Sequence, residues 1–305
     1  MALVTGGAGF IGSHLVRRLL ADGWRVRVLD NFDTGHRSNL DGLAVDVLEG
    51  DLRTDCEAAV AGCSRVFHLA AIASVPRSVA HPDESFAVNA LGTSRLFEAS
   101  RRAGVSRVVC ASSAAVYGPT GAVVSEDQVL RPQSPYGAEK AAMEHLATAY
   151  GAALGLEVVC LRFFNVYGPR QDPSSAYAGV IAAFCAALAA GRVPVVHGDG
   201  SQSRDFVYVS DVVDALVLAA DHGVAGVPYN VGTGRPTSVI ELLRNLQAAL
   251  DAPPDATFGD RRAGDLDRSC ADVSRLATLG FRAQVDLAEG LLHTGRWYRE
   301  HFASR

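Results

Sequence analysis

A tyrosine and a lysine one helical turn apart, Tyr136 and Lys140, are the residues best suited to acid–base chemistry in this sequence. Ser134 and Pro135 are typical of a helix start, so both side chains are expected on one helical face. A phenol with a pKa of about 10 is a poor base at neutral pH. A nearby lysine and a cationic ring would lower that pKa and match the phenol to an alcohol proton. The alternative is a surface tyrosine beside a solvated lysine.

Two hydroxyl side chains, Ser112 and Ser113, follow the apolar run Arg107–Cys110. That run is typical of a buried parallel strand, and ligands in such folds bind at the carboxyl ends of the strands. The two serines are therefore expected at the edge of a sheet where ligands bind, close to Tyr136 and Lys140.

A glycine-rich segment, Gly6–Gly12, lies between an apolar strand and an amphipathic helix. Gly6 permits a tight turn, Gly9 lets the backbone approach a pyrophosphate, and Gly12 allows close packing of helix and strand. The amino end of the helix offers unpaired N–H groups and a partial positive charge to phosphates. The segment therefore predicts a dinucleotide site, with a purely structural glycine turn as the alternative.

An acidic residue, Asp30, ends the next expected strand. Its carboxylate can accept hydrogen bonds from both ribose hydroxyls of the adenosine and would repel a 2′-phosphate, which favours NAD over NADP. The neighbouring His36 and Arg37 leave NADP open as an alternative. Asp51 and Leu52, after the third expected strand, are expected to contact the adenine.

The first half of the chain alternates short apolar runs with amphipathic segments such as Phe10–Asp22. The runs are too continuously apolar to have one wet face, which is typical of parallel strands covered on both sides. Such alternation implies right-handed crossovers and predicts an α/β fold, a Rossmann-type doubly wound parallel sheet. The expected strands are Ala2–Thr5, Arg25–Asp30, Val45–Glu49, Arg65–Leu69, Arg107–Cys110 and Glu157–Arg162.

This alternation stops after about Asn165, where glycine- and proline-rich loops begin. We expect residues 1–165 to form the dinucleotide-binding domain and residues 166–305 mainly a smaller substrate-binding α/β region. The two are expected to be interleaved, because Val227–Val231 is typical of a strand and residues 206–231 would return it to the main sheet. The helices expected here are Ala176–Ala190, Ser210–Asp221, Ser238–Leu250 and Asp286–Phe302.

Composition excludes several classes of protein. Of the 305 residues, 49% are hydrophobic and 20% charged, so a sizeable core is expected. The net charge of -5 argues against a nucleic-acid partner. No run approaches the ~20 apolar residues of a membrane span, and the amino terminus has no signal-peptide pattern. Six scattered cysteines and nine histidines without ligand spacing favour buried thiols in the cytoplasm and no metal site.

Further motifs accompany these residues over nearly the whole chain. They are His68–Ala71, Asn89 with Gly92 and Thr93, Ser112–Gly118, Ser134–Lys140, Arg162–Gly168 and Ser203–Asp205. With Gly6–Gly12, this combination resembles the extended short-chain dehydrogenase/reductase family, and within it the UDP-sugar 4-epimerases.

The resemblance implies roles for individual residues. Tyr136 would be the catalytic base, Lys140 would hold the nicotinamide ribose and tune the phenol, and Ser113 would hydrogen-bond the sugar hydroxyl. The implied NAD contacts are Gly6, Gly9, Phe10, Ile11, Gly12, Asp30, Asn31, Asp51, Leu52, Leu69, Ala70, Ala71, Asn89, Tyr136, Lys140 and Phe163.

The second half would form the UDP-sugar pocket. Asn165 and Arg204 match positions that hold the diphosphate, and Arg262 and Asp265 match a later phosphate and ribose pair. An arginine suits this role because its planar fork binds phosphate bidentately, although Arg204 and Arg262 as surface ion pairs are the alternative. The implied substrate contacts are Ser112, Ser113, Asn165, Val180, Val195, His197, Arg204, Arg262, Asp265 and Ser269.

The residues after Ser113 discriminate between the reactions of this family. Its dehydratases resemble Thr-Asp-Glu-Val-Tyr-Gly there and its decarboxylases Thr-Ser-Glu-Val-Tyr-Gly, whereas this chain has Ala114 and Ala115. Alanines move no protons, so 4-epimerisation through a 4-keto sugar is favoured. A dehydratase, a decarboxylase and a non-catalytic NAD-binding regulator remain alternatives. The exact hexose stays open among glucose, N-acetylglucosamine and glucuronate, and a homodimer is expected from the family.

Overall fold

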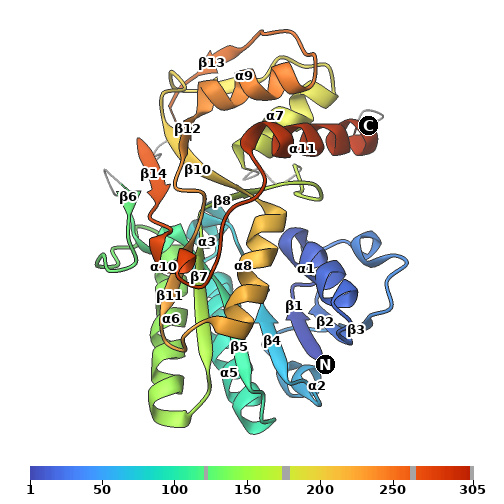
Figure 1. The fold of residues 1–305 in the computed structure, drawn as a ribbon, viewed down its shortest axis with the longest axis vertical. Helices are drawn as coiled ribbons and strands as arrows, with labels where there is room; N and C mark the ends of the chain where they lie inside the picture. Colours follow the sequence, from blue (N-terminus) through green and yellow to red (C-terminus); the bar gives the residue numbers. More distant parts are fainter. Residues whose placement is uncertain (120–122, 174–178, 262–265, 303–305) are drawn as a thin grey trace.

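The computed structural model describes residues 1–119, 123–173, 179–261 and 266–302. Its centre is a seven-stranded parallel sheet with the order β11-β7-β5-β4-β1-β2-β3 (Figure 1). This order confirms the expected Rossmann-type doubly wound fold. The strands are β1 (Ala2–Thr5), β2 (Val26–Asp30), β3 (Asp46–Glu49), β4 (Arg65–His68), β5 (Arg107–Ser113), β7 (Val158–Phe163) and β11 (Pro228–Val231).

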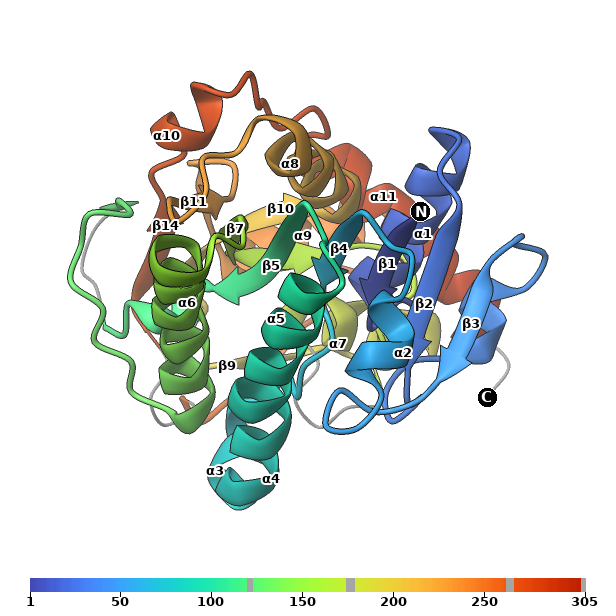
Figure 2. The same ribbon diagram turned by 90° about the horizontal axis from the view of Figure 1, so that it is seen from below.

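Helices cover both faces of this sheet, as the continuously apolar strands require (Figure 2). Helices α1 (Phe10–Ala21) and α8 (Val209–His222) lie on one face. Helices α2 (Cys56–Val60), α5 (Thr93–Arg102) and α6 (Pro135–Leu154) lie on the other. Shorter connecting segments are η1 (Arg37–Leu40), α3 (Val75–Ala80), α4 (Pro82–Phe86), η2 (Ala87–Gly92), η3 (Ala114–Val116) and α10 (Ser274–Ala277).

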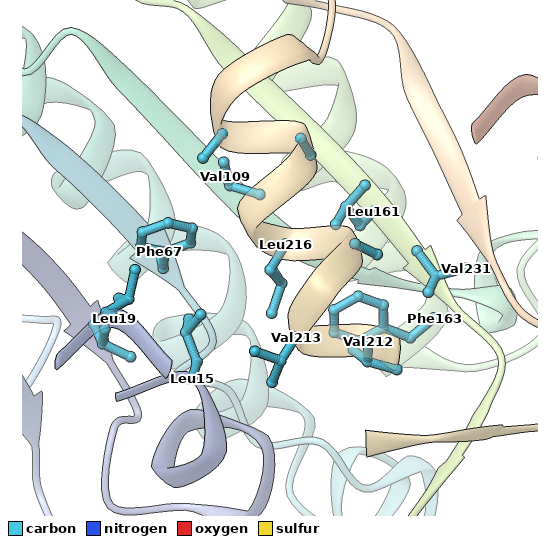
Figure 3. Close-up of a cluster of buried hydrophobic side chains, with 14 of the residues drawn as sticks. Leu15, Leu19, Phe67, Val109, Leu161, Phe163, Val212, Val213, Leu216 and Val231 are labelled. Atoms are coloured by element: carbon cyan, nitrogen blue, oxygen red, sulfur yellow. The ribbon is translucent and has the colours of Figure 1, made fainter. Parts of the chain in front are cut away.

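Residues distant in sequence complete this part of the molecule. β11 pairs in parallel with β7, with Val231 opposite Phe163. Figure 3 shows side chains of α8, among them Leu216, packed over Val109 and Leu161 of the sheet. Burying one such side chain stabilises a fold by about 1.5–3 kcal/mol. The expected strand at Val227–Val231 therefore does return to the main sheet.

The remaining elements form a second, smaller layer above the carboxyl edge of the sheet (Figure 1). A five-stranded sheet contains β12 (Pro236–Ser238), β10 (Ser203–Tyr208), β14 (Arg268–Ala271), β6 (Val123–Val124) and β8 (Asn165–Tyr167). β9 (Val195–His197) pairs with β13 (Thr257–Gly259). Helices α7 (Val180–Ala189), α9 (Val239–Ala249) and α11 (Leu287–Phe302) share a separate apolar core.

Local capping signals in the sequence are confirmed. The Ser134 hydroxyl accepts a hydrogen bond from Gly137 N at 3.1 Å at the start of α6, and Ser238 accepts one from Glu241 N at 3.2 Å at the start of α9. Several strand and helix ends differ from the expected ones by one or two residues, and the end of β5 differs most among the strands. β5 continues to Ser113, because β7 extends equally far and pairs with it through Phe163. Both serines therefore lie within the strand rather than after it.

The thiols, the helices and the possible metal ligands can be inspected directly in the structure. All six cysteines are buried and free. Among the described helices, none combines the length and apolar character that a membrane span requires. In the described ranges, no group of three or more side chains is arranged as metal ligands.

Candidate active site

A cavity of about 650 Å³ lies along the carboxyl edge of the main sheet. The turn between β1 and α1 lines it, together with residues at the ends of β2, β3, β4, β5 and β7. This is where a doubly wound sheet binds its ligands. The sequence-predicted residues on its wall are Gly6, Gly9, Phe10, Ile11, Gly12, Asp30, Asn31, Asp51, Leu52, Leu69, Ala70, Ala71, Ser112, Ser113, Tyr136, Lys140, Phe163 and Asn165.

The glycine turn has no room for side chains. Gly6 has φ +69°, and a Cβ there would lie 2.8 Å from Ala70 N. A Cβ at Gly12 would lie 2.1 Å from Gly6 O. At Gly9 a Cβ would lie 3.2 Å from Gly6 O, which is also a tight contact. Backbone N–H groups can thus approach a phosphate closely at this turn, and the residues present fit a dinucleotide.

Asp30 lies at the end of β2 and is almost fully buried. Its Oδ2 accepts from Ala8 N at 2.9 Å and its Oδ1 from Phe32 N at 2.8 Å. Burial raises its pKa, and these two hydrogen bonds oppose the increase. Each oxygen retains a lone pair toward the cavity for a ribose hydroxyl. Asp51 lines the same end, and the pKa of its carboxyl is lowered, first by its hydrogen bond with Arg53.

The turn after β4 is held from beneath by a threonine that sequence reasoning missed. Thr5 Oγ1 accepts from Leu69 N and Ala70 N, each at 3.2 Å, and lies 2.9 Å from His68 Nδ1. Burial lowers the pKa of His68 to about 3, so this histidine is neutral. These contacts fix the cavity wall at Leu69 and Ala70.

Asn89 does not line the cavity, in contrast to the expected cofactor contact. It is buried behind the wall, where its amide exchanges hydrogen bonds with the backbone of Ile72 at 2.8 and 3.1 Å. Its Nδ2 also donates to Glu139 Oε2 at 2.7 Å. In the protein itself, Asn89 therefore supports the cavity wall.

The three candidate catalytic side chains meet at one place. Ser113 from β5 hydrogen-bonds the Tyr136 hydroxyl, and Lys140 Nζ lies 5.8 Å from the centre of the tyrosine ring. Lys140 is buried and its Nζ donates to Ala111 O at 2.8 Å. The helical spacing and the cap at Ser134 thus place phenol and ammonium on the face of α6 that turns toward β5.

Taken together, the protein's own groups raise the pKa of the Tyr136 phenol rather than lower it. Desolvation raises the pKa of Tyr136, the hydrogen bond with Ser113 lowers it, and Glu139 raises it further. Burial also lowers the pKa of Lys140 to about 8. The expected lowering needs a lysine and a cationic ring together, and in the protein by itself the Lys140 ammonium donates to a backbone carbonyl.

Ser112 has a structural partner. Its hydroxyl donates to Glu144 Oε1, and that carboxylate is held by Arg162 with Nη2 2.6 Å from Oε2. The arginine also donates to Tyr117 at 2.8 Å. This buried network orders the end of β5. Ser112 also lines the cavity, but its hydroxyl proton is directed to Glu144, so toward a ligand its oxygen could act only as an acceptor.

The expected substrate contacts separate into two groups. Ser112, Ser113 and Asn165 line the cavity, whereas five others lie in the smaller layer, outside the described cavity wall: Val180, Val195, His197, Arg204 and Ser269. Arg204 of β10 is paired in register with Ser269 of β14, so these two are neighbours. His197 contacts the backbone of Asp260 at 3.1 Å. Arg262 and Asp265 lie outside the described residues.

Sequence reasoning missed several cavity residues. They are Asp33, Thr34, Gly35, Arg53, Arg77, Glu84 and Gln171. Gly35 approaches Asp30 so closely that a Cβ would lie 3.0 Å from both carboxylate oxygens. The one signal available for Asp33, Thr34, Gly35 and Arg53 was their closeness in sequence to Asp30 and Leu52, whereas Arg77, Glu84 and Gln171 reach the cavity from distant segments.

Comparison with known proteins shows what this arrangement is similar to. Residues 2–232 match the model of the NAD dependent epimerase/dehydratase family. UDP-glucose 4-epimerase of Mycolicibacterium smegmatis is 44% identical, over 97% of this chain and 98% of the relative. The structure of UDP-N-acetylglucosamine 4-epimerase from Methanobrevibacter ruminantium, in complex with UDP-N-acetylmuramic acid, has TM-score 0.95 and 37% identity, with 98% of each chain covered. That of Thermus thermophilus UDP-glucose 4-epimerase in complex with NAD has TM-score 0.91 and 41% identity, covering 98% of this chain and 99% of the other.

Proposed function

Since this chain belongs to the NAD dependent epimerase/dehydratase family, we propose that it is an NAD-dependent UDP-hexose 4-epimerase that oxidises C4 of the sugar and then reduces it from the opposite face. The observation that carries this proposal is the meeting of Ser113, Tyr136 and Lys140 at the wall of the cavity that the glycine turn also lines. The similarity to 4-epimerases over nearly the full chain supports it.

The protein's residues divide the work of the reaction. The Tyr136 oxygen takes the proton of the C4 hydroxyl and later returns it to the reduced oxygen. The Ser113 hydroxyl, already bonded to that phenol, orients the sugar oxygen between them. Lys140 holds the nicotinamide ribose and supplies positive charge. NAD, when bound, supplies the hydride acceptor that also gives the hydride back, and its positive ring is the second charge needed to lower the phenol pKa.

The carboxylates around the cavity favour epimerisation over elimination of water. Elimination needs an additional acid and base next to the sugar. Within the described ranges, the carboxylates on the cavity wall come from the ends of β2 and β3 and from α4, and Ala114 and Ala115 follow Ser113. They are Asp30, Asp33, Asp51 and Glu84. A dehydratase of the same family is the second candidate.

A substrate panel tests the reaction. The purified protein is incubated separately with UDP-glucose, UDP-N-acetylglucosamine and UDP-glucuronate, and the products are separated by chromatography. We expect at least one to be converted to an equilibrium mixture with its C4 epimer. Formation of a 4-keto-6-deoxy sugar instead would identify a dehydratase, and release of carbon dioxide from UDP-glucuronate a decarboxylase.

Tyr136→Phe tests the base. Only the phenolic oxygen carries the proton, so we expect turnover to fall about 10²–10⁴-fold while NAD binding and folding are retained. Ser113→Ala is expected to cost less, because water can take over part of the hydroxyl's role. Near-normal turnover of Tyr136→Phe would remove this residue from the chemistry.

We further propose that Asp30 selects NAD over NADP, since a 2′-phosphate would meet its carboxylate. Calorimetric titration of the cofactor-free protein is expected to show tighter binding of NAD. Equal or tighter binding of NADP would contradict this, and would point to His36 and Arg37.

The width of the sugar pocket is a separate proposal. Ser269 lies beside Arg204 in the β10–β14 pair, and in the resembling epimerases a tyrosine at the matching position narrows the pocket. A serine there leaves room for an acetamide or an oxidised C6. Ser269→Tyr is expected to lower kcat/KM for UDP-N-acetylglucosamine more than for UDP-glucose, because overfilling a packed site costs about 1–3 kcal/mol. An unchanged ratio would remove Ser269 from the pocket.

We also propose a cytoplasmic homodimer. Phe86 and Leu91, beside α6, are 58% and 43% exposed, which supports a partner surface at this side of the molecule. The buried free thiols support a reducing compartment. Light scattering of the wild type is expected to give twice the mass of one chain. Phe86→Asp is expected to shift the measured mass toward that of one chain. A wild-type mass equal to that of one chain would exclude the dimer.

A further inference from the structure

A ring of polar and charged side chains borders one side of the cofactor cavity and has no part in the proposed chemistry. Its members come from four segments: the ends of β2 and β3, and the short helices α3 and α4. They are Asn31, Asp33, Asp51, Arg53, Arg77 and Glu84, and all of them line the cavity.

One half of the ring joins the ends of β2 and β3. Arg53 donates from Nε to Asp51 Oδ1 at 2.9 Å and from Nη2 to Oδ2 at 2.7 Å. The Asp51 carboxylate also hydrogen-bonds the Asn31 side chain. Asp33 N donates to Asn31 Oδ1 at 3.2 Å. This half of the ring lies close to Asp30, the carboxylate at the end of β2 that is proposed to bind the adenosine ribose.

Arg77 of α3 joins the other half. Its Nη1 lies 2.5 Å from Asp33 Oδ2 and its Nη2 lies 2.8 Å from Glu84 Oε1. Glu84 in turn attracts Arg53, so negative and positive groups alternate from Asp51 to Asp33, and the neutral Asn31 joins those two acids. Arg77 and Asp33 are 44 residues apart in the chain, and their contact connects the loop after β2 to α3 across the cavity side.

We propose that Arg77 is a positioning residue that closes this ring beside bound NAD and slows its release between turnovers. The inference rests on the proposed function, in which the cofactor is regenerated in every cycle and has no need to leave. Arg77 suits this role because one planar guanidinium reaches two carboxylates from different segments. Its side chain is 28% exposed and those of Asp33 and Glu84 are each 45% exposed, so the pairs are within reach of salt.

The release of NAD measures this role directly and needs no sugar. The full-length protein is loaded with radiolabelled NAD, excess unlabelled NAD is added, and the label retained on a filter is followed with time. We expect Arg77→Gln to speed release about three- to tenfold, since partly exposed ion pairs are individually weak. Raising the salt concentration should speed release from the wild type and change the variant little.

Arg18 offers a matched control. It also pairs with two carboxylates, Asp22 and Asp214, and its side chain is 40% exposed, but it does not line the cavity. Arg18→Gln removes the same charge and two ion pairs, one at the end of its own helix α1 and one to α8. Its NAD release is expected to match the wild type.

Removing the partners provides a test that does not depend on the fold of Arg77→Gln. Asp33→Asn and Glu84→Gln should each speed release in the wild type and add little in the Arg77→Gln background. Unchanged release in all three single variants, or equal acceleration by Arg18→Gln, would overturn the proposal. If Arg77→Gln released NAD faster but the wild-type protein epimerised no UDP-hexose, the role of Arg77 would be supported and the proposed function refuted.

Discussion

At the scale of the residue, burial determines which charges the site can use. Tyr136 and Lys140 are both desolvated, and desolvation disfavours the charged form of each. The phenol is therefore a weak acid in the protein itself, and the ammonium a stronger acid than a free lysine. The reactive pair depends on its surroundings, above all on the positive charge that the cofactor brings.

The pH dependence of turnover follows from Lys140. Its pKa is lowered to about 8, so the side chain is charged below that pH and loses its charge as the pH rises through it. We expect kcat to fall above about pH 8 as the ammonium that supports the phenolate is lost. Steady-state kinetics across the alkaline range measures this.

Lys140→Met is the control for that profile. The variant lacks the titrating group, so its lower activity should show no decline near pH 8. A wild-type kcat that stays constant well above this pH would show that the charge of Lys140 is not required.

At the scale of the element, the short helix α3 positions the catalytic helix. Ser78 Oγ accepts from Tyr136 N at 3.1 Å and donates to Val75 O at 2.7 Å. The first N–H groups of a helix have no partner within it, so this contact satisfies one of them in α6. The α3 helix therefore connects the cavity wall to the backbone of the proposed base.

Ser78→Ala is expected to lower kcat several-fold with little change in the dissociation constant of NAD. The lost hydrogen bond is worth about 1 kcal/mol, and it releases the backbone that carries the phenol. Ser238→Ala removes an equivalent hydroxyl contact at the start of α9 and should change stability alone. Equal effects of both variants on kcat would refute a positioning role for Ser78.

A second contact between elements makes stability depend on pH. His14 of α1 contacts Pro169 O through Nε2 at 3.0 Å, and its Nδ1 lies 3.1 Å from Arg170 Nη2. The carbonyl can only accept and the guanidinium can only donate, so the ring is neutral with its hydrogen on Nε2. Burial and then Arg170 lower the pKa of His14 to about 4.

The sign of the effect follows from this lowered pKa. The unfolded chain takes up the proton near its ordinary pKa, about 6.5, before the folded chain does. The stability contributed by His14 is thus complete above about pH 6.5 and is lost as the pH falls toward about 4, by at most roughly 3 kcal/mol. Urea unfolding at about pH 7 and pH 4.5 should show a smaller difference for His14→Gln than for wild type.

Exposed His145 on α6 provides the control for this measurement. His145→Gln should retain the wild-type dependence on pH, and buried His68 contributes equally in all three proteins. If His14→Gln lost as much stability on acidification as the wild type, the buried His14 would not be the source of that loss.

At the scale of the whole molecule, the two halves of the chain share one core. β11 adds the last strand of the main sheet, and α8 contributes six buried apolar residues to the core over that face. We expect a fragment of residues 1–165 to bind a hydrophobic dye and to unfold without a cooperative transition, because the face under α8 would be exposed. Circular dichroism and dye fluorescence, with the refolded full chain as reference, measure this. Cooperative unfolding of the fragment would show that residues 1–165 are an autonomous domain.

Local signals made much of this molecule predictable. The turn at Gly6 and Gly12, the cap at Ser134 and the spacing of Tyr136 and Lys140 act within a few residues of the chain, where backbone geometry follows directly from residue type. Continuously apolar runs likewise required a sheet covered on both faces. These features determined the fold class, the dinucleotide turn and the shared face of phenol and ammonium.

Contacts between distant segments decided the rest. The side chain of Asn89 hydrogen-bonds the backbone of Ile72, and the hydroxyl of Ser112 donates to Glu144, partners that no local pattern predicted. Arg77 had no motif, yet it lines the cavity between two carboxylates. A sequence pattern specifies which groups are available, whereas burial and the third dimension determine which partner each one meets. The chemistry of this protein was therefore readable in its residues, and the arrangement that holds the site together was visible only in the fold.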